Sequence, residues 1–342
     1  MNQFLTLLFS FIMVAPLSLV AAASDDEVTG SWFLSIDNDL IASSDDDYTS
    51  GVQAGWVSGY LDSYREGPLP NFLADRLDNI AMLNGSQRQR FVSHSLSHRI
   101  FTPSDTETTE LIEGDIPYSG LLFGTITAGA QDDKTMDAFS FHYGIAGPAA
   151  MGEQLQNGLH KMIGSEQVNG WDNQISNEII VNFNYEHRRR LASFDFGGGL
   201  RADILGQAGA TVGNLISMAT VGVGGRIGWG LQDDYAIPPQ FFSEETIGSR
   251  PYSKGSSKGG FWFFALINGS AIANAIFWDG NTFRDSPSVD YDPLIGRVYI
   301  GAVKRFEDWK VSVSMAKTTV PWENPADKSV QTYGRLSFSY GY

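Results

Sequence analysis

The alternation of apolar with small or polar side chains is the dominant pattern of the chain from Gly30 onward. It recurs in segments of about ten residues, separated by loops rich in Gly, Asp, Ser and Asn. A period of two is typical of β-strands with one apolar face, and this length suits a strand that crosses a bilayer at a tilt. We therefore expect an all-β protein, either a soluble sandwich or a transmembrane up-and-down antiparallel β-barrel.

The alternating segments predict about twelve strands, and bacterial barrels have an even number. This count treats residues 260–283 as one long strand. Two longer stretches, 61–88 and 231–258, contain Pro, Gly and charged residues and are expected to be loops, the first with a short helix near 72–83. The expected strands lie at residues 30–39, 48–60, 89–101, 118–130, 137–147, 173–188, 191–204, 217–230, 260–283, 289–306, 309–320 and 331–342.

The N-terminus carries an apolar run, Phe4–Val20, that leads into Ala21, Ala22 and Ala23. This pattern predicts a signal peptide at residues 1–23, followed by one barrel domain at 24–342. No Lys or Arg precedes the run, so an uncleaved anchor is the alternative. No later segment has the roughly 18 consecutive apolar residues that a transmembrane helix needs.

The final segment alternates apolar and small residues and ends on the aromatic Tyr342, as outer-membrane barrels commonly do. Together with the signal peptide, it predicts a protein of the bacterial outer membrane. Trp and Tyr near strand ends are typical of interfacial girdles, although an ordinary aromatic core is the alternative. The residues in question are Trp56, Tyr60, Trp171, Trp229, Trp262, Trp278 and Trp309.

The amino-acid composition excludes cysteine-based sites and argues against one class of partner. The chain has no cysteine, so disulfides and thiolate metal sites are excluded. Its formal net charge of -16 argues against a nucleic-acid partner, because no basic surface replaces the counterions around phosphates. The acidity favours divalent cations instead.

In an up-and-down barrel, the loops after odd-numbered strands all lie at one rim. The first such loop carries Asn38, Asp39 and the stretch Asp45–Thr49, and the fifth strand is followed by Gly147-Pro148 and the segment 151–164. The two polar clusters are therefore expected at the same rim, where they can form one site.

The segment 152–164 predicts one short helix in this fifth loop, because its apolar residues recur at helical spacing. Gln156 and His160 are four residues apart and share a face. We expect the apolar stripe to pack on the barrel while these two polar side chains project into a groove. The stripe consists of Leu155, Leu159, Met162 and Ile163.

His160 is a candidate general base, since a histidine can accept a proton from water at neutral pH. The alternative is a surface helix with one incidental histidine. The carboxylates of the first loop, Asp39 with Asp37 and Asp45–Asp47, supply hard oxygen ligands that favour calcium over zinc or copper. Asp39 is the best ligand candidate, and Asp45–Asp47 are better explained as a solvated loop.

Two blocks of residues resemble the outer-membrane lipid A 3-O-deacylases. The first is Ile36–Asp39 followed by Asp47–Gly51. The second, more specific block comprises Gly147-Pro148, Gly152, Gln156-Asn157, His160, Ile163-Gly164, Trp171 and Gln174-Ile175. Beyond the blocks, the order and approximate length of the strands are similar from about Gly30 to Tyr342.

The resemblance implies a calcium-dependent esterase that removes the 3-linked acyl or acyloxyacyl chain from lipid A of lipopolysaccharide. Its site would lie between the barrel wall and the short helix at the outward-facing rim of a monomeric twelve-stranded barrel. His160 matches the catalytic histidine, Asn38 and Asp39 the family's Asn-Asp pair, Thr49 its threonine and Gln156 its helix glutamine. Asp39 and Thr49 are the implied metal ligands.

One departure concerns the third loop, where some members carry adjacent basic residues that meet the lipid A phosphate. Here 102–115 is acidic, and Arg99 is the nearest basic candidate. Two other functions fit parts of the pattern. An outer-membrane phospholipase would need a serine beside His160, and Ser165 lies on a different helical face. A porin or structural barrel would leave the helix unexplained.

Overall fold

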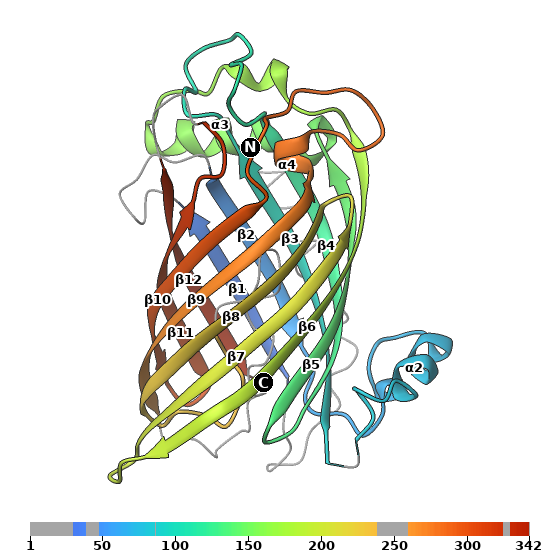
Figure 1. The fold of residues 1–342 in the computed structure, drawn as a ribbon, viewed down its shortest axis with the longest axis vertical. Helices are drawn as coiled ribbons and strands as arrows, with labels where there is room; N and C mark the ends of the chain where they lie inside the picture. The colour runs from blue at the N-terminus through green and yellow to red at the C-terminus, as the bar shows by residue number, and fades with distance from the viewer. Residues whose placement is uncertain (1–29, 39–47, 86, 238–258, 324–328, 342) are drawn as a thin grey trace.

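The computed structural model describes residues 30–38, 48–85, 87–237, 259–323 and 329–341. The predicted signal peptide, 1–23, lies outside the described residues. Twelve strands form one closed barrel in which each strand pairs antiparallel with its neighbours in sequence, and β1 with β12 closes the cylinder, as Figure 1 shows. The predicted fold class and strand number are confirmed.

The strands are β1 (Ser31–Asn38), β2 (Tyr48–Val57), β3 (Gln89–Phe101), β4 (Ser119–Gln131), β5 (Thr135–Ala146), β6 (Glu178–Asp195), β7 (Leu200–Gly213), β8 (Ile216–Trp229), β9 (Gly260–Ala275), β10 (Leu294–Arg305), β11 (Trp309–Thr319) and β12 (Val330–Gly341). Short helices lie in the connections: η3 (Tyr64–Glu66), α2 (Asn71–Asp78), η4 (Pro148–Ala150), α3 (Gly152–Ile163), η5 (Gly170–Asn173) and α4 (Ile276–Asp279). Among the described residues, no helix is long and apolar enough to cross a membrane.

The largest differences from the predicted strand boundaries concern β6, β7 and β9. β6 and β7 both lie further along the chain than expected, because the run Arg188–Arg190 is part of β6 and not a turn. Arg188 is fully buried inside the barrel. The turn is instead Gly197–Gly199, whose positive φ angles suit glycine. The expected strand 260–283 ends at Ala275, where α4 begins.

The two rims differ in the length of their loops. The rim reached by odd-numbered strands, at the top in Figure 1, carries the long connections 102–118, 147–177 and 276–293, and we call it the α3 rim. The opposite α2 rim has the tight turns 132–134, 196–199 and 306–308, besides two longer connections, 58–88 with α2 and 230–259. Outer-membrane barrels have short turns on the periplasmic side, so we expect the three tight turns to place the α2 rim there and the α3 rim outside.

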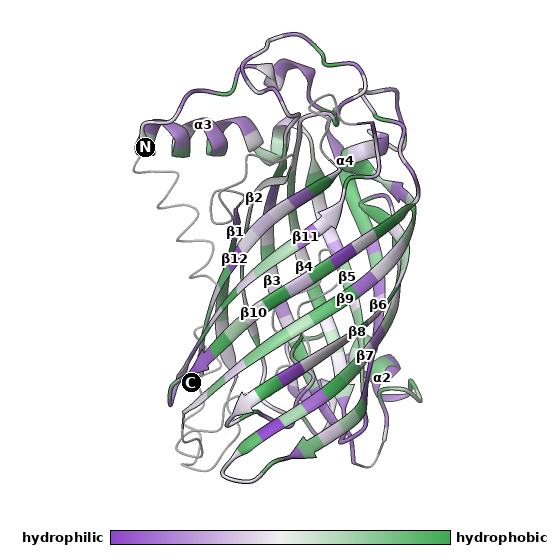
Figure 2. Cartoon of the chain, turned by 60° about the vertical axis from the view of Figure 1, so that its left-hand side comes forward, coloured by the Kyte–Doolittle hydropathy of each residue, from purple (hydrophilic) through white to green (hydrophobic). Residues whose placement is uncertain are grey.

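Side chains alternate between an apolar outer face and a polar lumen, as in β9, where Ile267 is exposed and its neighbour Asn268 is buried. Figure 2 shows hydrophobic and hydrophilic residues interspersed along the strands. This is the arrangement of a strand with one side against lipid. Of the proposed girdle residues, Trp229 and Trp309 are about half exposed at the α2 rim, the latter against Tyr340.

Three other tryptophans do not belong to a girdle. Trp171, Trp262 and Trp278 are buried, so for them the prediction was wrong and the alternative, an aromatic core, is correct. The strand-end pattern does not distinguish an outward from an inward side chain unless the register is known.

Loop residues fill the lumen at the α3 rim. Phe277 and Trp278 of α4 pack with Phe101 of β3 and Trp322 in one buried apolar cluster. Phe101 and Phe277 are stacked with ring centroids 4.3 Å apart. This cluster caps the barrel below the loops.

The segment 231–237 fills the lumen at the α2 rim. Tyr235 and Ile237 are buried in a cluster with inward side chains of the strands. Arg188 donates to the carbonyl oxygen of Tyr235 at 2.7 Å. Arg226 is fully buried between Asp203 and Asp234. Hydrogen bonds and ion pairs of buried arginines therefore hold the segment 231–237, which we call the inner plug, inside the barrel.

Candidate functional site

The helix α3 rests against the outside of the barrel wall. Gly120 faces outward on β4, because the next residue, Leu121, belongs to the cluster inside the barrel. A Cβ on Gly120 would lie 3.1 Å from the backbone of Gly152, and one on Gly152 would lie 2.5 Å from the Trp171 ring. Two glycines thus allow the first turn of α3 to touch the wall.

The rest of α3 extends beyond the wall. Figure 2 shows the helix reaching outward across the rim, with the tops of β1 and β2 below it. Leu155 is half-buried against a cluster that includes Ile100 and Trp171. Leu159 and Met162 are 41% and 62% exposed. The expectation that the whole apolar stripe packs on the barrel is therefore wrong for these two residues, because the wall ends beneath them.

Gln156 is buried and holds α3 to the loop that follows it. Its Oε1 accepts a hydrogen bond from Trp171 Nε1 at 2.9 Å. The Trp171 ring in turn packs against Tyr118, whose pKa burial raises to about 12, so that its hydroxyl stays protonated. Gln156 and His160 share the helix as expected, but Gln156 does not project into an open groove.

Asn157 fastens the segment after α3 back onto the helix. Its Oδ1 accepts from the Val168 N–H at 2.8 Å, and its Nδ2 donates to the Val168 carbonyl oxygen at 3.1 Å. This two-point contact fixes the path of 164–169 beside the last turn of α3.

His160 lies in that last turn, half-buried, with Nδ1 2.5 Å from the carbonyl oxygen of Glu166. A carbonyl oxygen only accepts hydrogen bonds, so Nδ1 must carry the proton in this contact. In the neutral ring, Nε2 is then left with a free lone pair. The backbone of Glu166 therefore selects the tautomer that a general base requires.

His98 is a polar residue of the site that the sequence reasoning missed. It lies on the outward side of β3, and its Nε2 is 2.7 Å from the carbonyl oxygen of Ala150, directly before α3. The available signal was the pair His94 and His98, two titratable residues on the face of a strand that otherwise meets lipid. His98 fixes the entry to α3 against the wall.

The end of β1 brings two expected residues to the same rim. Asn38 is half-buried on the outer face and pairs in register with Ser50. Asp37 faces the lumen, where Arg335 Nη2 donates to its Oδ2 at 2.8 Å and Arg99 forms a second ion pair. Asp37 is therefore no candidate calcium ligand, and Arg99 is not available to bind a phosphate.

The predicted ligand Asp39 lies outside the described residues, and so does the stretch Asp45–Asp47. The backbone of Thr49 belongs to β2, but its side chain is not described. Within the described residues, no group of three or more His, Asp or Glu side chains is arranged to hold a metal ion.

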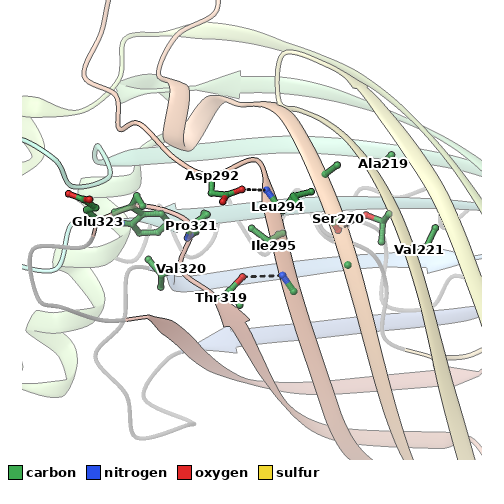
Figure 3. Close-up of a pocket in the computed structure, with 15 residues that line it drawn as sticks. Ala219, Val221, Ser270, Asp292, Leu294, Ile295, Thr319, Val320, Pro321 and Glu323 are labelled. Carbon is green, nitrogen blue, oxygen red and sulfur yellow. Dashed lines mark hydrogen bonds between the residues drawn. The ribbon is translucent and has the colours of Figure 1, made fainter.

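A separate groove of about 910 Å³ lies on the outer wall across β8–β11, shown in Figure 3. Gly296 N–H donates to Thr319 Oγ1 at 3.0 Å, and Leu294 N–H donates to Asp292 Oδ1 at 2.9 Å. The lining is mostly apolar and contains no histidine. Its strands are not those that carry α3, so this groove is not part of the candidate site.

The closed twelve-stranded barrel has an apolar outer face, which defines an integral outer-membrane protein. The helix that carries the candidate histidine lies outside the barrel wall, so the candidate site faces the membrane side. The family model described as outer membrane protein LpxR matches residues 5–342. The chain belongs to this family, whose members are lipid A 3-O-deacylases, a class of hydrolase.

One solved structure supports the fold. LpxR from Salmonella typhimurium is 17% identical, with a TM-score of 0.71 over 91% of this chain and 100% of its own. The β domain of the Bordetella autotransporter BrkA is 8% identical, with a TM-score of 0.43 over 92% of this chain and 100% of its own, too distant to carry an argument. No curated protein sequence matches the chain.

The glycine contact at the foot of α3 gives a testable expectation. Gly152→Ala places a methyl group against Trp171 and should push the helix from the wall, and displacement by about 1 Å can cost roughly 100-fold in rate. Gly158→Ala is the matched control, because a Cβ there meets nothing within 4 Å. Deacylation rates measured on lipid A by mass spectrometry should fall only for Gly152→Ala, and equal rates would contradict the proposed role of this contact.

Proposed function

We propose that this chain hydrolyses the 3-linked acyl or acyloxyacyl ester of lipid A in a calcium-dependent reaction, with His160 as the general base. The observation that carries the proposal is the contact of His160 Nδ1 with the Glu166 carbonyl oxygen, which leaves Nε2 to take a proton from water. Family membership supports the substrate, lipid A of lipopolysaccharide.

The location of the site supports a substrate that lies in the outer leaflet. His160 is carried by a helix outside the wall at the outer rim, so a lipid can approach it sideways without leaving the membrane. Leu159 and Met162, exposed on the same helix, would meet the acyl chains of that lipid. One chain closes the barrel and carries every proposed residue, which favours a monomer.

The donor chemistry at the end of β1 fits calcium. The amide of Asn38 and the hydroxyl of Ser50, register partners at the rim, are hard oxygen donors, and Asp39 and Thr49 directly adjoin them in the sequence. We assign Asp39 and Thr49 as ligands, with Asn38 beside them. Calcium bound there would polarise the ester carbonyl and stabilise the developing oxyanion.

The remaining residues position the base. Gln156 holds the middle of α3 through the Trp171 indole, and His98 holds its start through Ala150. Water held near Nε2 of His160 attacks the ester carbonyl as the imidazole takes its proton, and the protonated ring then returns a proton to the leaving oxygen. No covalent acyl-enzyme is required.

The two alternatives fit the described residues less well. A serine phospholipase needs a hydroxyl within reach of the His160 ring, but Ser165 contacts His160 through its backbone N–H, which donates to the His160 carbonyl oxygen. A porin needs an open lumen, whereas apolar loop residues cap one mouth and 231–237 fills the other.

The test is expression in a bacterial host of known lipid A structure, followed by mass spectrometry of the lipid A. We expect loss of one 3-linked acyl or acyloxyacyl group. With purified protein, a calcium chelator should abolish the reaction and added calcium should restore it, while a serine-directed inhibitor should have no effect. An unchanged lipid A spectrum with folded protein and calcium present would refute the proposal.

A further inference from the structure

The arm, defined as residues 58–85, connects β2 to β3 at the α2 rim and contains η3 and α2. It packs on the outside of the barrel wall. Tyr64, fully buried, donates its hydroxyl proton to the Gly129 carbonyl oxygen at 2.7 Å. Leu77 and Leu83 of the arm share an apolar cluster with Val92 of β3, which faces outward because its neighbour Phe91 lies in the lumen cluster.

The arm is braced internally, so its position on the wall is fixed. Asp78 at the end of α2 accepts from Ser63 Oγ at 2.6 Å and from the Tyr64 N–H at 3.2 Å. Arg90 of β3 donates to the Asp62 carbonyl oxygen at 2.7 Å. Arg90 also donates to Asn84 Oδ1 at 3.0 Å, so β3 holds both ends of the arm and keeps α2 beside the barrel.

With the α3 rim facing outward, the arm at the opposite rim lies toward the inner leaflet. Figure 1 shows α2 to the side of the barrel, above the lowest turns of the α2 rim. The surface that it covers is the outward, lipid-facing side of β3 and β4, so lipid would contact those strands if the arm were absent.

Two apolar side chains of the arm are uncovered. Phe72 is 74% exposed and Met82 is 43% exposed. Met82 borders the outward face of the wall, because the Tyr185 hydroxyl lies 3.4 Å from its Sδ and 2.7 Å from Asp137 Oδ1, and the Tyr185 ring packs against outward Phe139. Arg76 shares the exposed side of α2 with Phe72, an arrangement suited to the boundary between acyl chains and headgroups.

We propose that the arm is a membrane-contacting element that inserts Phe72 and Met82 among the phospholipids of the inner leaflet, with Arg76 at the level of their phosphates. The occupant is lipid and not a protein partner, because Met82 adjoins the outward face of the wall, which meets lipid in an outer-membrane barrel. This inference goes beyond the proposed reaction, which takes place at the opposite rim.

The absence of cysteine makes a direct test available, since each single substitution creates a unique labelling position. Phe72→Cys and Met82→Cys are spin-labelled in vesicles of phosphatidylethanolamine and phosphatidylglycerol, and the collision rates of each label with oxygen and with a water-soluble nickel chelate are compared. Val298→Cys, outward on β10, is the lipid control, and Asp133→Cys, in a tight turn of the same rim, is the aqueous control.

We expect both arm labels to favour oxygen over the nickel chelate, as the Val298→Cys label does. Labels that collide with the chelate as often as the Asp133→Cys label would overturn the proposal, and so would labels shielded from both reagents. The shift of the folded barrel on unheated gels verifies that each variant is folded. Because the measurement needs no substrate, it fails or succeeds independently of the proposed reaction.

Discussion

Replacing His160 with Gln is expected to lower the rate of lipid A deacylation by roughly two to four orders of magnitude, the usual contribution of a general base. Glutamine retains an N–H that can donate to the Glu166 carbonyl oxygen, so the end of α3 should keep its path. It has no nitrogen that accepts a proton from water. The rate is measured by mass spectrometry of lipid A incubated with purified protein in detergent and calcium.

Lys161→Gln is the matched control, because Lys161 is the next residue of the same helix turn and is exposed. It should leave the rate within a few-fold of the native value. If His160→Gln retained most of the native rate while the protein remained folded, the base would have to be another group, and the proposal for His160 would be withdrawn.

The second large effect concerns stability. Arg226→Met should destabilise the barrel by about 3–5 kcal/mol, because it leaves the carboxylates of Asp203 and Asp234 buried without their shared cation. Arg226 donates to Asp203 through Nε at 2.9 Å and to the Asp234 carbonyl oxygen at 2.8 Å. Urea unfolding followed by tryptophan fluorescence measures the change.

Arg201→Met provides the comparison, since Arg201 pairs with Asp233 at 2.6 Å in a partly exposed position. Exposed ion pairs contribute less than about 1 kcal/mol. Combining Arg226→Met with Asp203→Asn and Asp234→Asn should recover much of the lost stability by removing the unpaired charges. Equal effects of the two arginine substitutions would show that the inner plug does not depend on its buried cation.

The strand number, the rim that carries the polar loops and the helix at 152–164 were all predictable from the sequence. Each depends on a local period, two for a strand and 3.6 for a helix, that is visible without knowledge of the rest of the chain. The boundary between β6 and β7 was not predictable in this way. A run of three arginines is typical of a turn unless the lumen supplies acceptors such as the Tyr235 carbonyl oxygen.

The contacts of α3 could not be predicted from local sequence patterns either, because they involve residues that are distant in the sequence. Gln156 lies four residues before His160 and was therefore expected to be exposed on the same helix face. It is buried because the chain after α3 folds back and places Trp171 against it. Asp37 was counted among possible metal ligands, although the alternation of Leu34 and Ile36 outward already placed it on the opposite face. His98 is known as a site residue only because Ala150 comes to rest on β3.

Because apolar rings pack together at one end of the cylinder and 231–237 packs inside the other, we expect the described residues to leave hydrated solutes no route through it. Cells that hold many copies should thus exclude bulky polar antibiotics and dyes as well as cells without it. Any fatty acid released beside α3 would diffuse laterally into the surrounding lipid. The barrel would therefore carry an active site on its outer surface and would not act as a transport channel.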